Sequence, residues 1–542
     1  MKCILPYFCV VLTVFLCTNC RSTRALDGQL RRAMDTEDAR VSDHTRDDAL
    51  GALAPFLSSD EALQLNAQSV LELAFNHGRS LQTSREALFT QFLNLLGQRR
   101  ALGLRVSGDG RYGIGLSSSD DEDTAVEINV QDRFASGAQL NLQGSSESAF
   151  EPTANNEGVE RLFSTLATAT LTQPILNGAG YTASHAELIQ EERSLLYALR
   201  GFELARQDYA IEILEAYYGL IGQRAVLDNI RLNVEQSGFL QERSEAMFKV
   251  QMAPYIDVLR SQQQALAAET RLSSAEAGFE TALRRFLVQL GVPPELQVAF
   301  TNDIPDMTPF VGALEPCVDI ALDYRLEILT AENRLQDAER NHWVARNNLW
   351  PELNLFTRAR VVSDPEMDFP GGDFSEELTA GLNIAIPFDQ RSERDRVKAA
   401  EIVLAAADRN FDQQLANVRI DIIDHYNTLK NLNRKVEIER LNNEIALKRV
   451  RNAVLRFKNG ELSNRDVVEA ENGLLDARNA LVQALIDHEI ERLSLLRNMG
   501  LLDVTPSGRL LENIEKANGE ATLFASPVHI DLRRTSTKSS YE

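Results

Sequence analysis

Acidic and histidine side chains are the residues of this 542-residue chain whose types and spacing could do chemistry. Asp466 and Glu469 lie three residues apart, which would place both carboxylates on one face of a helix. The seven histidines are scattered along polar segments, and no pair has metal-ligand spacing with a third ligand nearby. We interpret as surface residues the histidines His77, His185, His342, His425 and His488.

Catalytic and nucleotide-binding motifs are missing from the sequence. It contains no HExxH, no P-loop and no glycine-rich nucleotide pattern. An exported enzyme on a helical scaffold would need a constellation of this kind. The sequence therefore predicts no catalytic residue, no metal site and no cofactor.

The net charge of the chain disfavours one class of binding partner. The formal net charge is −23, which disfavours nucleic acid because phosphates would be repelled. Charged residues make up 25% and hydrophobic residues 44%, as in ordered proteins. The excess of acidic residues indicates either a role in solubility alone or a lumen lined by acidic side chains.

Residues 1–20 are typical of an export signal, with Lys2 followed by an apolar run from Ile4 to Cys17. Cys20 follows a poor version of the lipoprotein signal, and Thr23–Ala25 offers a competing cleavage site. Lipidation of Cys20 and loss of the signal by ordinary cleavage both stay open. Residues 21–55 are charged and aperiodic, which predicts a flexible leader.

The main part of the chain is duplicated. Residues 248–291 and 457–500 align at a constant offset of 209, with Asp257 matching Asp466 and Gly291 matching Gly500. We expect a first repeat over 56–291, a proline-rich linker over 292–316 and a second repeat over 317–502. A polar C-terminal tail over 503–542 completes the predicted organisation.

Each repeat alternates between helical and strand periodicity. Helical patterns are expected from 58 to about 100, with a break near 76–78, and from about 182 to 250. The second of these would be about 100 Å long at 1.5 Å per residue, so it needs partners along its length. Period-two runs after Leu102, across 124–146 and across 353–386 predict antiparallel hairpins. Their alternation suits either a wall between lipid and water or an ordinary half-buried sheet.

Four segments resemble the TolC-type outer-membrane efflux proteins, which are outer-membrane channels of tripartite efflux or type I secretion systems. The segments are Glu61–Leu65, Leu171–Leu176, Phe457–Ser463 and Asp466–Val468, in the family's order and within a duplicated layout. The resemblance implies a mainly α fold with β structure. Long antiparallel coiled-coil helices would form a trimeric α-barrel, capped by a trimeric transmembrane β-barrel.

The resemblance also implies the function and the partners. The homotrimer would be a passive exit channel, in contact with outer-membrane lipid and projecting into the periplasm of a Gram-negative-type bacterium. A periplasmic adaptor and an inner-membrane pump or ABC exporter would deliver its substrates. The alternative hypothesis is a periplasmic coiled-coil spacer or adaptor without a pore, which would not explain paired β segments in both halves.

Family knowledge places the two helix-to-helix turns at the periplasmic tip, where the duct closes and the adaptor binds. The residues implied at the tip are Gln251, Met252, Ala253, Asn459, Gly460, Glu461, Leu462 and Ser463. Asp466 and Glu469 match a lumen-facing acidic ring near the constriction, and Asp257 matches a residue of the closing latch. An ordinary first-turn aspartate, favoured by the helix dipole, is the other interpretation of Asp466.

The chain departs from the family in two places. At the tip, Gln251 stands opposite Gly460, and the latch lacks its aromatic hydroxyl and arginine because Phe457 and Leu462 occupy those positions. In the strand region, each half of a family member typically supplies two strands, whereas the first half here could supply four. The extra hairpin near 124–146 could join the barrel or lie outside it.

Overall fold

The computed structural model describes residues 63–114, 122–152, 159–251, 254–301, 304–363, 374–459 and 461–513. Its helices are α4 (Ala67–His77), α5 (Arg79–Leu102), α6 (Tyr181–Ser184), α7 (Ala186–Lys249), α8 (Tyr255–Gln289), α9 (Leu314–Tyr324), α10 (Leu326–Asn347), α11 (Arg391–Lys458) and α12 (Asn464–Asn498). Its strands are β1 (Leu63–Leu65), β2 (Arg105–Ile114), β3 (Glu122–Arg133), β4 (Gln139–Pro152), β5 (Val159–Pro174), β6 (Val298–Phe300), β7 (Glu352–Ser363), β8 (Phe374–Ala385), β9 (Leu502–Val504) and β10 (Leu510–Glu512).

The chain divides into two units. Among the described residues, the sheet unit lies within 87–199 and 330–412, and the helical unit lies within 63–86, 200–329 and 413–513. Four helices, α5, α7, α10 and α11, contain a boundary between the units. No helix of the described residues is both long and apolar enough to cross a membrane.

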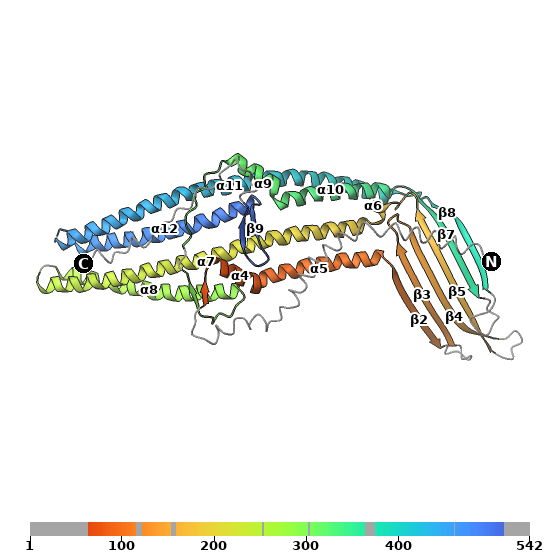
Figure 1. Ribbon diagram of the computed structural model, residues 1–542, viewed down its shortest axis with the longest axis horizontal. Helices are drawn as coiled ribbons and strands as arrows, with labels where there is room; N and C mark the ends of the chain where they lie inside the picture. Colours follow the sequence, from red (N-terminus) through yellow and green to blue (C-terminus); the bar gives the residue numbers. More distant parts are fainter. Residues whose placement is uncertain are drawn as a thin grey trace. The chain divides into compact units, whose positions relative to one another are not determined.

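The sheet unit is built on six antiparallel strands in the order β2-β3-β4-β5-β7-β8 (Figure 1). Four strands come from the first half of the chain and two from the second, and β5 joins β7 across the halves. The hairpin near 124–146, whose place the sequence left open, is therefore an integral part of this sheet: β3 pairs along its length with both β2 and β4.

The register sorts the side chains of the sheet onto two chemically different faces, because successive residues of a strand point to opposite sides. One row of directly paired residues is apolar on all six strands: Val106, Val130, Leu142, Ala169, Ala359 and Leu378. The next row, on the opposite face, is polar on all six: Arg105, Gln131, Asn141, Thr170, Arg358 and Thr379.

The apolar face of the sheet is exposed in the single chain. Val106 is 67% exposed, and Leu378 and Leu382 are each 61% exposed. Large apolar side chains are rarely left in such a contiguous patch unless something apolar covers them. This face is therefore built for a non-aqueous neighbour.

The helical unit preserves the duplication predicted from the sequence. Helices α8 and α12 each have 35 residues and begin and end at positions 209 residues apart. The preceding helices α7 and α11 have 64 and 68 residues, and both end at the equivalent lysines Lys249 and Lys458. At 1.5 Å per residue they are about 96 and 102 Å long, consistent with the length expected for the first of them.

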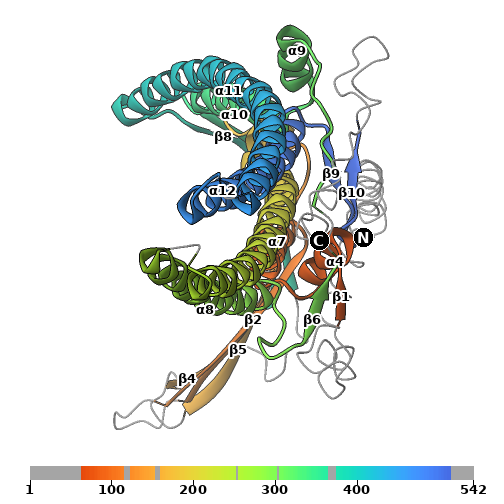
Figure 2. The same cartoon turned by 90° about the vertical axis from the view of Figure 1, so that its left-hand side faces the viewer.

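Packing within the helical unit explains how such long helices persist. Figures 1 and 2 both place α7 beside α8 and α11 beside α12. Tyr217 on α7 and Ile422, Leu429 and Val436 on α11 are completely buried. Their spacings of seven residues along α11 are those of a coiled-coil seam, in which tertiary contacts rather than intrinsic propensity stabilise the helix.

The two short returning helices end in the same way. Gly291 follows α8 with φ 81°, and Gly500 follows α12 with φ 71°. In each case the next two backbone amides bond back to the last turn: Gly291 and Val292 to Val288 and Leu287, and Gly500 and Leu501 to Arg497 and Leu496. Glycine suits this left-handed helix end because it has no Cβ.

Two expectations at the ends of the repeats need correction. The helix expected from residue 58 begins only at Ala67, after the Asn66 cap, because Leu63–Leu65 instead pairs in parallel with Val298–Phe300. The tail expected over 503–542 starts with ordered structure, since β9 and β10 form a hairpin there. In both cases long-range pairing decides the local structure, and local pattern does not reveal it.

Candidate functional site

The second helix-to-helix turn, between α11 and α12, is held by a capping box. Ser463 is the N-cap of α12, as predicted, and its amide and hydroxyl both donate to Asp466 Oδ2, at 3.0 and 2.6 Å. The side chain of Asp466 is exposed, and these hydrogen bonds from Ser463 hold the pKa of its carboxyl below its usual range. Asp466 is therefore ionised at neutral pH and has a structural partner.

The neighbouring acidic residues of the second turn form ion pairs with α11. Glu469 Oε1 lies 2.8 Å from Arg449 Nη2, which joins α12 to α11. Glu461 Oε2 lies 3.0 Å from Arg456 Nε, which fixes the turn to the end of α11. Both pairs are more than half exposed, so each adds little stability and their geometry matters more than their energy.

The first turn, between α7 and α8, is built differently. Gln251 has φ 61° and is the one non-glycine residue of the described chain with positive φ. The N-cap of α8 is Pro254, which makes no side-chain capping bond. Asp257, in the first turn of α8, pairs with Arg260 of the same helix at 3.1 Å.

A hydrophobic cluster lies beneath the second turn. Phe457, the residue that replaces the expected latch aromatic, is 8% exposed and packs with Val454, Val467 and Ala470. The guanidinium of Arg243, on α7, lies 4.9 Å from the centre of the Phe457 ring. The equivalent Phe248 is instead 42% exposed and contacts Tyr255.

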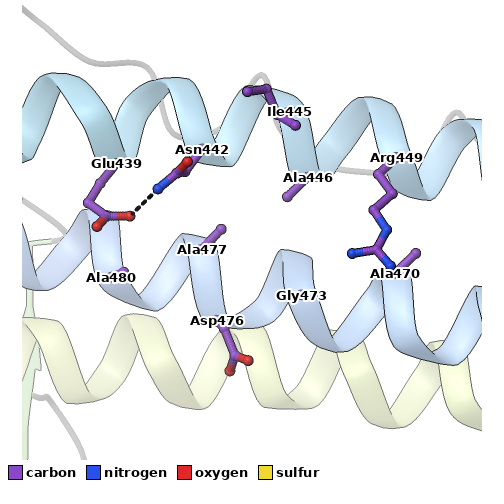
Figure 3. Close-up of a pocket in the computed structure, with 10 residues that line it drawn as sticks. All are labelled: Glu439, Asn442, Ile445, Ala446, Arg449, Ala470, Gly473, Asp476, Ala477 and Ala480. Atoms are coloured by element: carbon purple, nitrogen blue, oxygen red, sulfur yellow. Dashed lines mark hydrogen bonds between the residues drawn. The ribbon is translucent and has the colours of Figure 1, made fainter.

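A groove runs between α11 and α12 close to this end (Figure 3). Its α12 side carries Asp476 and small residues at spacings of three and four: Ala470, Gly473, Ala477 and Ala480. Its α11 side carries Glu439, Asn442 and Arg449, and Asn442 donates a hydrogen bond to Glu439 at 3.2 Å. Small residues on one wall and polar residues on the other leave room for an incoming helix.

Several residues singled out in the sequence lie outside the described chain. These are Cys20, Met252, Ala253 and Gly460, and the segments 1–20 and 21–55. The remaining tip residues Gln251, Asn459, Glu461, Leu462 and Ser463 all lie in the two turns. Asp466 and Asp257 lie in the first turns of α12 and α8, and Glu469 lies one turn further along α12.

The interpretation of every histidine as a surface residue is wrong for two of them. His185 and His488 are 6% and 1% exposed. The Nε2 atom of His488 lies 2.7 Å from Asn433 Oδ1, and burial, with Arg492 nearby, lowers the pKa of His488 to about 4. Among the described residues no group of three His, Cys, Asp or Glu side chains could hold a metal ion.

Sequence reasoning missed a buried ionic cluster in the helical unit. The guanidinium of Arg492 donates to both carboxylate oxygens of Glu489 and to both of Glu512, at 2.8 to 2.9 Å. Arg492 is 7% exposed, so removing one partner would leave a buried charge. The three-residue spacing of Glu489 and Arg492 was visible in the sequence, but the contribution of Glu512 from β10 was not.

Comparison with known proteins agrees with this architecture. Residues 317–501 match the family model described as "Outer membrane efflux protein". No curated protein matches the chain at a significant level of sequence similarity.

Solved structures extend the likeness over most of the chain. The outer membrane protein VceC from Vibrio cholerae superposes with a TM-score of 0.60 at 14% identity, covering 80% of this chain and 96% of that one. The CmeC outer membrane channel from Campylobacter jejuni gives 0.58 at 14% identity, covering 83% and 87%. The MtrE outer membrane channel from Neisseria gonorrhoeae gives 0.56 at 14% identity, covering 80% and 88%.

The sequence match covers one part of the chain, and the structural likeness covers most of it. The family model accounts for the second repeat, and the solved channels share the fold across both repeats. This family consists of outer-membrane channels rather than enzymes, and its members extend into the periplasm. Residues 317–501 therefore match this family's model, and most of the chain shares the fold of solved outer-membrane channels.

Proposed function

We propose that three copies of this chain form a passive exit duct across the outer membrane and the periplasm. An inner-membrane pump or ABC exporter, joined by a periplasmic adaptor, would deliver the substrates. The observation that carries this proposal is a row of paired residues that is apolar on all six strands of the sheet, beside a row on the opposite face that is polar on all six. One face suits lipid and the other suits water, as a channel wall requires.

Aromatic side chains at one end of the sheet support a membrane boundary there. Trp350 precedes β7 and is 59% exposed, and Phe388 follows β8 and is fully exposed. The paired residues Glu352 and Ala385 place these two aromatics at the same end of the sheet. Tryptophan and other aromatic rings are enriched at the interface between lipid and water.

The helical unit supplies the features of a periplasmic duct. Its two turns, from 251 to 254 and from 459 to 463, would form the tip, and the groove of Figure 3 lies beside the second turn. We propose that an adaptor helix contacts this tip. The small residues of α12 support this because they allow a second helix to approach closely.

Bilayer recordings test the channel directly. Purified protein should require detergent for extraction and should produce discrete conductance steps in a planar bilayer. A protein that is extracted without detergent and forms no pores would instead be the periplasmic spacer.

We further propose that Asp466 and Glu469 contribute negative charge near the constriction. Replacing both residues, as Asp466→Asn with Glu469→Gln, should lower the preference for cations by ~2-fold or more, because rings of carboxylates select cations. The measurement is the reversal potential in a salt gradient, with Asp323→Asn on α9 as the matched control. An unchanged reversal potential would leave Asp466 as a helix cap alone.

A further inference from the structure

The six-stranded sheet ends in two long edges with no partner in the described chain. Strand β2, of 10 residues, forms one edge, and β8, of 12 residues, forms the other. Each edge presents a row of backbone amides and carbonyls. Long exposed edges of this kind pair with another chain unless the protein protects them.

The outer hairpin, β2 with β3, has the same chemistry as the rest of the sheet. Val106, Val126 and Ile128 on its apolar face are 67%, 54% and 52% exposed. Val106 lies in the row that is apolar on all six strands, and the row of Ile128 continues through Gly144 to Ala167 and Val361. A hairpin folded away from the lipid would not need an exposed apolar face in that register.

The polar face is continuous across the same hairpin. A second polar row runs through Ser107, Asn129, Gln143, Thr168, Arg360 and Glu377. Gln143 Nε2 donates to Glu127 Oε1 at 2.9 Å, which joins β4 to β3 on this face. The extra hairpin is therefore attached to the water side of the wall by side chains as well as by backbone.

The direction of the edge strands decides how copies can meet. All neighbours in the sheet are antiparallel, so with six strands β2 and β8 run in opposite directions. The β8 edge of one copy can then continue the antiparallel ladder into the β2 edge of the next. Such head-to-tail contacts close into a ring when the copies are related by rotation.

We infer that β2, rather than β4, forms the contact between copies, and that a trimer therefore closes with six strands from each of three copies, eighteen in all. This inference rests on the proposed channel function. A family member with two strands per half would close with twelve. Because the diameter of a closed sheet grows roughly linearly with strand number, the wall here is about 1.5-fold wider.

A wider wall changes which part of the channel limits the size of its cargo. The cross-section at the membrane end would be about twice that of a twelve-stranded wall, from the same linear dependence of diameter on strand number. The membrane end then admits bulkier hydrophilic cargo than a twelve-stranded wall, and selection by size falls to the tip.

Disulfide trapping between copies tests which strand forms the contact. One cysteine is placed on the polar face of β8 and a second on the polar face of β2, in all pairings of Glu377, Thr379 and Gly381 with Arg105, Ser107, Asp109 and Arg111. At least one pairing should yield cross-linked trimers on non-reducing gels, because directly opposed strand residues lie within disulfide range. Cys317 is buried and can stay in place.

The matched control pairs the same β8 positions with Asn141, Gln143 and Ser145 on β4. If the outer hairpin lies outside the wall, β8 meets β4 and these pairs cross-link instead. That result, or the absence of any β8–β2 cross-link in pore-forming trimers, would overturn the inference.

Imaging of the unmodified trimer provides a measurement that needs no variant. Cryo-electron microscopy in lipid nanodiscs should show eighteen strands in cross-section, and twelve would reject the inference while leaving the channel intact. A protein that forms neither trimers nor pores would reject the proposed function itself, so the two failures are distinguishable.

Discussion

The two helix-to-helix turns of the helical unit join helices of matched length, yet they are stabilised by different local chemistry. The second turn has a serine cap, a capping box and an ion pair between α11 and α12. The first has a proline cap without a side-chain bond and a glutamine in the left-handed region. The returning helices α8 and α12 have equal length, whereas the turns that precede them differ.

The difference implies unequal stability at the two turns. A side-chain N-cap contributes about 1 kcal/mol, and a left-handed non-glycine residue costs roughly 1–2 kcal/mol. Both effects favour the second turn. We therefore expect the first turn to open more readily than the second.

The largest expected effect comes from the glycines that end the two returning helices. A Cβ on Gly291 would lie 2.0 Å from the His77 carbonyl oxygen, whereas one on Gly500 would lie 2.9 Å from that of Tyr324. With the strain of positive φ added to this overlap, Gly291→Ala should cost about 4 kcal/mol and Gly500→Ala about 3 kcal/mol. Thermal unfolding in detergent, followed by helical circular dichroism, measures both.

Gly278→Ala is the control for the glycine pair. This residue lies inside α8 and a Cβ there meets nothing within 4 Å, so alanine should stabilise the helix by about 1 kcal/mol. Equal losses at Gly291 and Gly500 would show that the two repeats are packed more alike than the structure indicates.

The next effect is a pH dependence that centres on His488 in the second repeat. His488 has a pKa of about 4 in the folded chain and 6.5 as a free side chain, and the first repeat has Phe279 at the equivalent position. The folded state resists protonation of His488, so the stability that its neutral form supplies is intact above pH 6.5. It is lost as the pH falls from 6.5 to 4, by up to about 3 kcal/mol.

His488→Phe should remove most of this acid sensitivity, which unfolding midpoints at pH 7 and pH 4.5 would show. His425 has the opposite effect on stability, because its hydrogen bond with Glu491 raises its pKa. The stability that protonated His425 supplies is lost as the pH rises above 6.5. An acid sensitivity that survives in His488→Phe would assign it to carboxylates or to His185, whose pKa burial also lowers.

The smallest effect concerns the strained first turn. Gln251→Gly should stabilise the chain by about 1 kcal/mol, since glycine adopts φ 61° without a Cβ penalty but has more freedom when unfolded. The same thermal assay detects it, and Gln251→Ala, which keeps the Cβ, is the matched control. If both variants unfold alike, strain at Gln251 does not weaken the first turn.

The helices and most strands were predictable because their periodicity is long and regular. The break between α4 and α5, the Ser463 cap and the equivalence of Asp257 with Asp466 all follow from local pattern. Local pattern could not reveal β1, β9 and β10, each three residues long, because distant segments create them. For the same reason it mistook His488 for a surface residue.

The candidate site was only partly predictable. Sequence comparison located both turns and their acidic residues. It could not show that Ser463 donates a hydrogen bond to Asp466, or that Asp257 forms an ion pair with Arg260. Those are questions of side-chain geometry, which the type and spacing of residues do not settle.

The sequence by itself determined that this chain is duplicated and built from long helices and alternating strands. Periodicity carries that information because each residue's face follows from its position in a helix or strand. Only the tertiary structure decided that the extra hairpin belongs to the sheet, since strand order depends on which distant backbones exchange hydrogen bonds. The same pairing made one row apolar and the next polar across six strands, which no single strand could specify.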